Sequence, residues 1–172
     1  MIKNWHQFNE SHNNILIRNI ESYDINEVLD LCAIVFDNVM EENELKSYLS
    51  SVTDWSISKK AVLNDKIIGC YLFNTEPVTD FLKNCECLKE DISKYENLRG
   101  IQGIALALLP EYRNSGIGRE LRSIPINMGF DYIWGQHLKE LHNITQWTKF
   151  GRRVVADGLV HDEDMYVTVM DL

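Results

Sequence analysis

Residues Gln102 to Gly118 read Q-G-I-A-L-A-L-L-P-E-Y-R-N-S-G-I-G. The apolar run from Ile104 to Leu109 is long enough for a buried strand and too short for a helix bounded in this way. Pro110 ends the run, because proline removes a hydrogen-bond donor and belongs at the end of a strand. Good helix formers follow from Arg119 onward. The sequence therefore predicts a buried strand, a glycine-containing turn and a helix, in that order.

The turn between this strand and this helix has the composition of an anion-binding site. Gly116 and Gly118 let the backbone approach a bound group closely. Backbone N–H groups at the start of a helix have no partner within the helix and carry partial positive charge. Arg113 adds a planar, permanently charged donor that suits phosphate oxygens. Together these features predict a site for a diphosphate group.

Three known types of phosphate-binding loop can be compared with this turn. A Walker loop requires Gly-Lys-Ser/Thr, and the sequence contains no such triplet. A dinucleotide-binding loop requires a third glycine three residues after Gly118, where this chain has Leu121. The third pattern, Pro-x-x-Arg-x-x-Gly-x-Gly after an apolar strand, matches from Pro110 to Gly118. It closely resembles the acyl-CoA loop of the GNAT (Gcn5-related) N-acetyltransferases. From the loop alone, an ordinary strand–turn–helix corner with a solvated arginine remains the alternative.

Length and composition indicate one globular domain. The chain has 172 residues, of which 45% are apolar, and this is enough for one buried core. We expect a single domain over residues 1–172, with an N-terminal arm at 1–13 and an insertion at 79–99. The formal net charge of −9 argues against nucleic acid or an anionic membrane as a partner. No stretch approaches the roughly 20 apolar residues that cross a bilayer.

The first residues and the cysteines predict a cytoplasmic protein. Residues Met1 to His6 lack the apolar core and cleavage-like site of a secretion signal. Cys32 and Cys70 lie in apolar patterns, so we expect them in the core as reduced thiols. Cys85 and Cys87 form C-x-C without a second pair or a paired histidine, so no metal site is expected.

Hydrophobic periodicity and turn residues predict the remaining elements. Asp24 and Glu27 have the spacing of a capping box in front of a helix. Asn64-Asp65 has the composition of a tight turn between two strands, and Pro125 is expected to kink or end its helix. The residues Asp162 to Asp164 are expected to join the last two strands. The predicted helices cover about 25–38, 41–51 and 138–149, and the other predicted strands cover about 15–20, 55–63, 66–74, 132–134, 152–160 and 165–170.

The resulting order of elements is β-α-α-β-β, an insertion, and then β-α-β-α-β-β. This order is also that of the GNAT proteins, and the resemblance extends from about residue 14 to the C-terminus. It implies an α/β fold, the GNAT acyl-CoA N-acyltransferase fold, with a central mixed sheet of six to seven strands flanked by about four helices. Family members are often dimers, so a homodimer is left open.

The resemblance also implies where acetyl-CoA, the family's co-substrate, would bind. In this fold acyl-CoA enters where two parallel central strands separate, and its pantetheine arm pairs with the first of them like an added strand. By position in the sequence, the residues that bind it would be Leu106, Ala107, Leu108, Arg113, Asn114, Ser115, Gly116, Ile117, Gly118, Arg119 and Asn143. For Ala107 the alternative role is packing alone, and for Asn143 it is a helix cap.

The chain departs from the family at two positions that usually handle protons. In direct transfer an amine loses a proton and attacks the thioester, a backbone N–H stabilises the oxyanion, and the thiolate leaves. Gln102 stands where many members have a glutamate, and Trp147 where many have a tyrosine. Candidate catalytic replacements are Glu76, His137, expected just after the fifth strand, and His142. Each belongs to a residue type that is common on surfaces, and a water chain would need none of them.

Two classes of function follow from the resemblance. The first is an acetyl-CoA-dependent N-acetyltransferase, an enzyme that acts on a small-molecule amine or a protein amine. The second is a catalytically silent GNAT-fold module that binds CoA or a regulatory ligand. The Arg-x-x-Gly-x-Gly loop supports binding of the co-substrate in both classes, whereas the missing glutamate and tyrosine favour the second.

Overall fold

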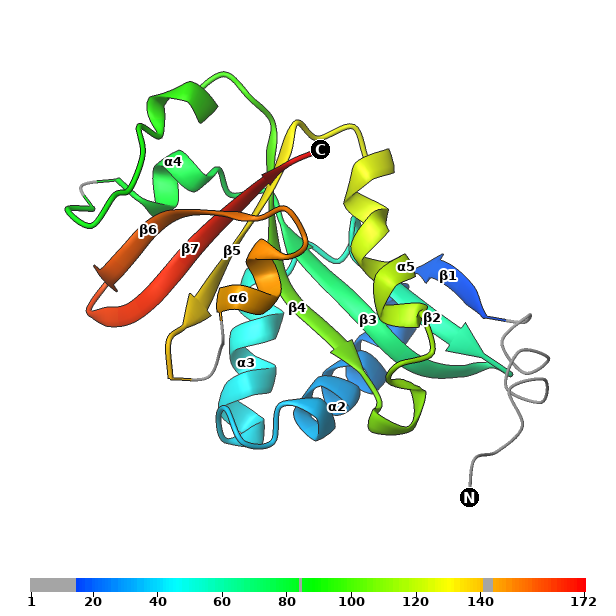
Figure 1. Ribbon diagram of the computed structural model, residues 1–172. Helices are drawn as coiled ribbons and strands as arrows, with labels where there is room; N and C mark the ends of the chain where they lie inside the picture. The colour runs from blue at the N-terminus through cyan, green and yellow to red at the C-terminus, as the bar shows by residue number, and fades with distance from the viewer. Residues whose placement is uncertain (1–14, 84, 141–143) are drawn as a thin grey trace. The chain divides into compact units, whose positions relative to one another are not determined.

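The computed structural model describes residues 15–83, 85–140 and 144–172 (Figure 1). Its strands form a seven-stranded mixed sheet in the order β1-β2-β3-β4-β5-β7-β6. The strands are β1 Leu16–Asn19, β2 Lys59–Leu63, β3 Lys66–Asn74, β4 Gly100–Leu108, β5 Tyr132–Leu138, β6 Arg153–Val160 and β7 Glu163–Asp171. The α-helices are α2 Ile25–Val35, α3 Glu42–Val52, α4 Val78–Phe81, α5 Ile117–Ser123 and α6 Ile144–Thr148. The predicted α/β class with a mixed sheet of six to seven strands is therefore confirmed.

The chain divides into two compact units. The first comprises residues 1–72 and 105–122, and the second comprises 73–104 and 123–172. β3 and β4 each contribute residues to both units. The assignment of 1–172 to a single domain stays a prediction.

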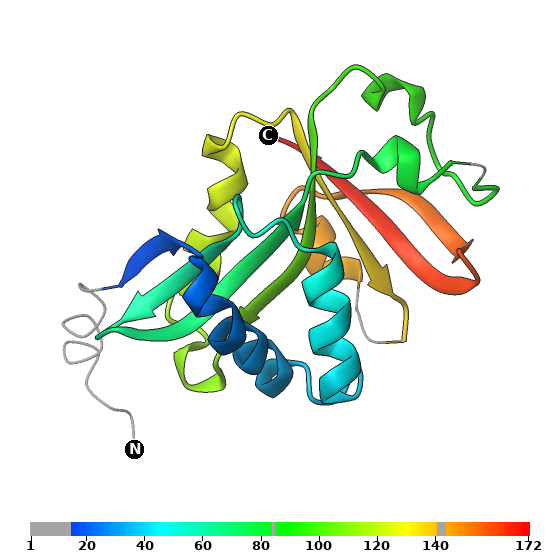
Figure 2. The same cartoon turned by 180° about the vertical axis from the view of Figure 1, so that it is seen from behind.

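In the first unit, helices cover both faces of β3. The Sγ atoms of Cys32 in α2 and Cys70 in β3 are 3.6 Å apart, and both residues are fully buried. The side chain of Arg122 in α5 lies near that of Tyr71, the next residue of β3. Because successive residues of a strand point to opposite faces, α2 and α5 lie on opposite sides of β3, as a comparison of Figures 1 and 2 shows. The prediction that Cys32 and Cys70 lie in the core is confirmed.

Two local predictions about turns and helix ends are confirmed. Asn64 and Asp65 join β2 to β3 with φ angles of 50° and 61°, the left-handed conformation that a two-residue hairpin turn requires. α5 ends at Ser123, and a 3₁₀ turn, Ile124–Asn127, takes over at Pro125. Proline lacks the N–H that would continue the α-helical pattern, which explains the early end.

The predicted capping box at Asp24 is wrong. Asp24 already has a helical conformation, because a 3₁₀ turn, Ser22–Asp24, leads directly into α2. Its carboxylate accepts a hydrogen bond from the Glu21 N–H at 2.7 Å and forms an ion pair with Lys60 of β2. Asp24 is therefore the third residue of a capping box that begins at Glu21, one turn earlier than predicted, and its ion pair fixes the start of α2 against the sheet.

In the second unit, the segment between β3 and β4 completes the core. Val78, Leu82 and Tyr95 from this segment are buried against β5, β6 and β7. The ring of Tyr95 lies 4.8 Å from that of Tyr132, and Phe81 lies 4.8 Å from Trp134. The predicted insertion therefore packs apolar side chains against the sheet and also carries a polar surface of its own.

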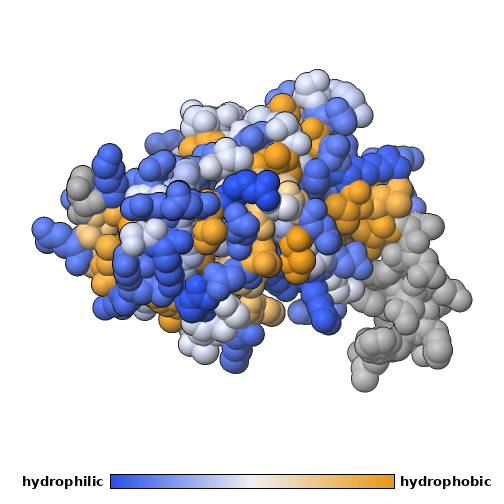
Figure 3. Space-filling view, turned by 90° about the horizontal axis from the view of Figure 1, so that it is seen from above, coloured by the Kyte–Doolittle hydropathy of each residue, from blue (hydrophilic) through white to orange (hydrophobic). Residues whose placement is uncertain are grey.

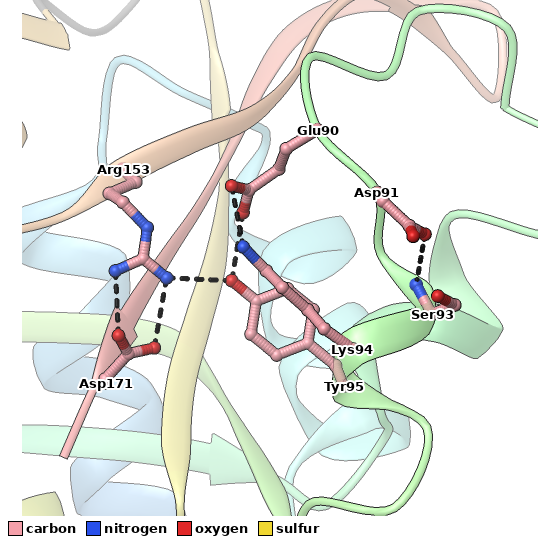
Figure 4. Close-up of polar contacts among 7 residues, drawn as sticks. All are labelled: Glu90, Asp91, Ser93, Lys94, Tyr95, Arg153 and Asp171. Carbon is pink, nitrogen blue, oxygen red and sulfur yellow. Dashed lines mark hydrogen bonds and ion pairs between the residues drawn. The ribbon is translucent and has the colours of Figure 1, made fainter.

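A polar network fastens the same segment to the edge of the sheet (Figure 4). Arg153 of β6 donates two hydrogen bonds to the carboxylate of Asp171, at 2.8 and 3.0 Å, and a third to the Tyr95 hydroxyl at 2.9 Å. The Tyr95 hydroxyl in turn donates to Glu90, which also pairs with Lys94. The hydrogen bonds from Arg153 hold the pKa of Asp171 below its ordinary value.

Two predictions in the second unit are wrong. The helix expected over 138–149 is shorter, because β5 continues to Leu138 and α6 covers only Ile144–Thr148. β5 pairs with β7 over its whole length, from Tyr132 with Asp171 to Leu138 with Met165. The last hairpin turns at His161 and Asp162, with φ angles of 52° and 68°, so Glu163 and Asp164 already belong to β7. In both places, long-range strand pairing outweighs local composition.

Hydrophilic side chains dominate the surface shown in Figure 3, with apolar side chains in small groups between them. This agrees with the strongly acidic composition of the chain. Within the described residues, no helix combines the length and the apolar character needed to cross a membrane.

Candidate functional site

The loop predicted to bind phosphate connects β4 to α5. After β4 ends at Leu108, a 3₁₀ turn, Pro110–Tyr112, leads into residues 113–116, and α5 begins at Ile117. Asn114 and Gly116 have φ angles of 62° and 93°, so the backbone bends sharply twice within three residues. A Cβ atom added at Gly116 would have no heavy atom within 4 Å. The loop therefore presents bare backbone to open space.

Several N–H groups of this loop are available to a ligand. In the described part of the chain, no hydrogen bond is made by the N–H groups of Asn114, Ser115, Gly116 and Gly118. The N–H groups of Arg119 and Glu120, by contrast, donate to the Gly116 carbonyl at 2.9 and 3.1 Å. Four neighbouring donors without protein partners are an arrangement that suits phosphate oxygens.

The side chains of the loop divide into anchors and exposed cations. Ile117 is 2% exposed and holds the loop against the core. The Ser115 hydroxyl donates to the Tyr112 carbonyl, which stiffens the turn. Arg113 and Arg119 are exposed, and Arg113 Nε donates to the Leu108 carbonyl at 3.4 Å. The two guanidinium groups add positive charge beside the four N–H donors.

β4 pairs with its parallel partner β5 over its first three residues. β4 and β5 pair only from Gly100 with Tyr132 to Gln102 with Trp134. β4 then continues to Leu108, so residues 103–108 extend beyond the pairing with β5. Leu106 and Leu108 are half-buried, whereas the Ala107 side chain is fully buried and packs in the core. Such a released strand edge is where an extended chain with amide groups can pair.

A buried polar cluster lies at the point where this pairing ends. His137, Arg152 and Thr168 are 6%, 7% and 0% exposed. His137 Nε2 lies 3.0 Å from the Thr168 hydroxyl, and Arg152 donates to the same hydroxyl at 3.2 Å. His137 lies within β5, so the expectation that it follows the strand is corrected. Sequence analysis missed Arg152 and Thr168, although a lone threonine in the apolar run of β7 was a visible signal.

Glu76 does not join this cluster. The Glu76 side chain is exposed, and its backbone carbonyl accepts a hydrogen bond from Trp134 Nε1 at 2.7 Å. His142 and Asn143 lie outside the described residues. Gln102, at the position of the family's glutamate, is 4% exposed and remains an amide that cannot take up a proton.

The surface around α2 and α3 contains an acidic hollow of about 870 Å³. Its lining includes Asp30, Asp37, Glu41 and Glu42 beside the apolar Ile34, Val39 and Met40. Lys46 pairs with both Asp30 and Glu42, at 2.6 and 2.5 Å, and neutralises part of this charge. Within the described residues, this hollow included, no group of three or more His, Cys, Asp or Glu side chains could hold a metal ion.

Comparison with known proteins identifies the fold. No protein-family model matches the chain, and neither does any curated protein. The Drosophila melanogaster polyamine N-acetyltransferase structure matches at a TM-score of 0.68 and 11% identity, over 92% of this chain and 100% of that one. The loading GNATL domain of CurA from Lyngbya majuscula matches at 0.63 and 15% identity, over 92% and 98% of the two chains. Arabidopsis thaliana Naa50, in complex with the bisubstrate analogue CoA-Ac-MVNAL, matches at 0.60 and 16% identity, over 92% and 99%.

The chain thus has the fold of the GNAT N-acetyltransferases, and the fold that the sequence resemblance implied is confirmed. At sequence identities of 11–17%, these matches show the fold alone.

Proposed function

We propose that this protein is an acetyl-CoA-dependent N-acetyltransferase that transfers an acetyl group by direct attack of an amine on the thioester. The observation that carries the proposal is the row of open N–H groups at Asn114, Ser115, Gly116 and Gly118, flanked by Arg113 and Arg119. A diphosphate with several negative oxygens matches this set of donors and cations.

The released edge of β4 supports the same proposal. The pantetheine arm contains two amide units, which can pair with the backbone of Leu106, Ala107 and Leu108 in the manner of an added strand. Asn143 remains a proposed contact of the same arm.

Transfer of the proton from the amine also needs an acceptor. We propose His137 as the first residue to test, because an imidazole exchanges protons near neutral pH. Glu76 and His142 are the other candidates, and Glu76 is exposed to solvent. The acceptor is a small-molecule amine or a protein amine.

One observation favours a second candidate function, a module that binds CoA without transferring the acetyl group. Gln102 is buried where many GNAT proteins have a glutamate, and its amide cannot act as a base. The loop and the strand edge would serve such a module equally well.

The two functions separate in an assay that follows release of the CoA thiol from acetyl-CoA. The amine panel contains polyamines, amino acids, lysine-containing peptides and peptides with free N-termini. We expect thiol release above the rate of hydrolysis with at least one class. Tight binding of acetyl-CoA without any release above background would instead establish the silent module, and absence of binding would remove both functions.

A further inference from the structure

Cys85 and Cys87 form a pair of thiols that the proposed function does not use. Their sulfur atoms lie 2.9 Å apart, and both residues are half-buried, so the thiols touch each other and remain reachable from solvent. The chain bends at Glu86, between them. Both residues belong to the second unit, together with α4 and β6. Two thiols in contact within one short bend are prepared to form a single intrachain bond.

Cys87 is fastened to the edge of the sheet. Its carbonyl accepts a hydrogen bond from the Asp157 N–H of β6 at 3.1 Å. Its thiol donates to the Leu159 carbonyl at 3.5 Å. Gly158 permits this close approach, because a Cβ atom added there would lie 3.0 Å from the Cβ of Cys87. The Cys87 sulfur therefore has a fixed position against β6.

Cys85, by contrast, lines a cavity of about 260 Å³. The ring of His161 packs edge-on against that of Phe81, with centroids 4.9 Å apart, and both residues belong to the lining. Lys83 and Glu86, both exposed, add one charge of each sign to the lining. The volume is below the roughly 300–1,000 Å³ of sites for drug-sized ligands. The cavity therefore gives a small molecule access to Cys85.

We propose that Cys85 and Cys87 are a modification site at which a low-molecular-weight disulfide oxidises the pair to an intrachain disulfide. The Cys85 thiolate attacks one sulfur of the small disulfide and expels the other as a thiolate, which leaves a mixed disulfide on Cys85. The Cys87 thiolate then attacks the Cys85 sulfur, and the second small thiolate leaves. The protons of the two cysteines pass to the two departing thiolates. The protein thus loses two electrons, and the small disulfide gains them.

The order of attack follows from the surroundings of the two thiols. Cys85 meets the small disulfide in the cavity, whereas Cys87 donates its hydrogen to a carbonyl of β6. Burial also raises the pKa of Cys87, so a smaller fraction of this residue is the reactive thiolate. Once Cys85 carries the mixed disulfide, the neighbouring Cys87 is already in place to attack it. This preorganisation favours the intrachain bond over reaction with a thiol from solution.

Mass spectrometry of the full chain, treated with hydroxyethyl disulfide without denaturant, tests the proposal. Remaining thiols are alkylated before digestion. Trypsin cuts after Lys83 and Lys89, so one peptide, residues 84–89, contains both cysteines. In the wild type this peptide should lose two hydrogen atoms and carry neither an adduct nor an alkyl group, and dithiothreitol should restore both thiols. Cys32 and Cys70 are fully buried and should remain thiols, which makes them internal controls.

Single variants separate the two steps. Cys87→Ser should stop after the first step and retain one hydroxyethylthio adduct on Cys85. Cys85→Ser should acquire its adduct several-fold more slowly, because the remaining thiol does not line the cavity and donates to the Leu159 carbonyl. Circular dichroism checks that both variants are folded.

The free peptide of residues 84–89 is the matched control, because it contains the same two thiols without the fold. In a buffer of hydroxyethyl disulfide and its thiol, the ratio of intrachain disulfide to mixed disulfide measures how well Cys87 is placed. This ratio should be several-fold higher in the native chain than in the peptide, since the bend and the contact between the sulfur atoms already exist there.

The proposal does not depend on acetyl-CoA binding, and these measurements can overturn it alone. A wild-type peptide 84–89 that keeps two alkylatable thiols would show an unreactive pair, and one that retains two stable adducts would show two independent thiols. A ratio no higher than that of the free peptide would show that the fold contributes nothing. Equal rates of adduct formation in Cys85→Ser and Cys87→Ser would overturn the assignment of Cys85 as the attacking thiol.

Discussion

The first unit contains two groups of polar atoms that differ in how far the protein satisfies them. The loop of residues 113–118 leaves four N–H groups without partners in the described part of the chain and exposes both of its flanking arginines. The pair of Asp24 and Lys60 is the opposite case, because both side chains are only 8% exposed and bond to each other. Burial alone would raise the pKa of Asp24, but the bonds from Lys60 and the Glu21 N–H, with the charge of Lys60, lower it below its ordinary value.

This difference separates binding from stability. Polar groups that already have buried partners hold the fold together, and removing one partner leaves an uncompensated charge inside. Polar groups that face solvent without partners contribute little to folding and remain available to a ligand. Substitutions in the loop should therefore change affinity, whereas substitutions in the pair should change the free energy of unfolding.

The largest effect should come from Lys60→Met. The substitution leaves the Asp24 carboxylate buried without its cation, which costs about 3–5 kcal/mol in comparable buried pairs. Urea denaturation measures the change in the free energy of unfolding. The double variant Asp24→Leu/Lys60→Met should recover much of the loss, because no charge is then left unpaired. Equal destabilisation in the single and double variants would show that the pair is not the source of the stability.

The next effect concerns the loop. Gly116→Glu places a carboxylate where the diphosphate is expected, and acetyl-CoA affinity should fall at least hundredfold, or about 2.7 kcal/mol. Gly116→Lys is the matched control, because it carries the same strain at a φ of 93° and adds the opposite charge. Both variants should lose the same small amount of thermal stability, and Gly116→Lys should bind more tightly than Gly116→Glu. Unchanged acetyl-CoA affinity in Gly116→Glu would remove this loop as the binding site.

A smaller effect should appear on acidification. Because the folded-state pKa of Asp24 is lowered, the stability it contributes is present above its unfolded-state pKa of about 3.9 and is lost as pH falls through the folded-state pKa. The free energy of unfolding of the wild type should thus decline more steeply below about pH 5 than that of Asp24→Asn. Parallel curves for the two proteins between pH 7 and 3 would contradict the lowered pKa of Asp24.

Features that depend on a few neighbouring residues could be predicted from the sequence. The Asn64-Asp65 turn, the end of α5 at Pro125 and the turn between β4 and α5 all follow from local backbone chemistry. The helix expected over 138–149 failed because the pairing of β5 with β7, across about 30 residues, extends the strand to Leu138. Local composition cannot reveal which distant strand will satisfy a segment's hydrogen bonds.

The same limit applies to the candidate site. The loop residues form one continuous segment, so their pattern was visible in the sequence. Arg152 and Thr168 are 16 residues apart and meet only because β6 and β7 pair. Asp24 and Lys60, 36 residues apart, were likewise invisible as a pair, and Asp24 was assigned to a helix cap. Contacts made by strand pairing could be identified only in the structure.

The placement of the four cysteines determines how a colorimetric thiol reagent will behave with this protein. Cys32 and Cys70 are fully buried, so they should stay silent until the chain unfolds. Cys85 and Cys87 are half-buried with their sulfur atoms 2.9 Å apart, and burial raises the pKa of Cys87. These two should give a slow background signal of up to two equivalents. A Cys85→Ser/Cys87→Ser protein would remove that background and make the slowest acetyl transfer measurable.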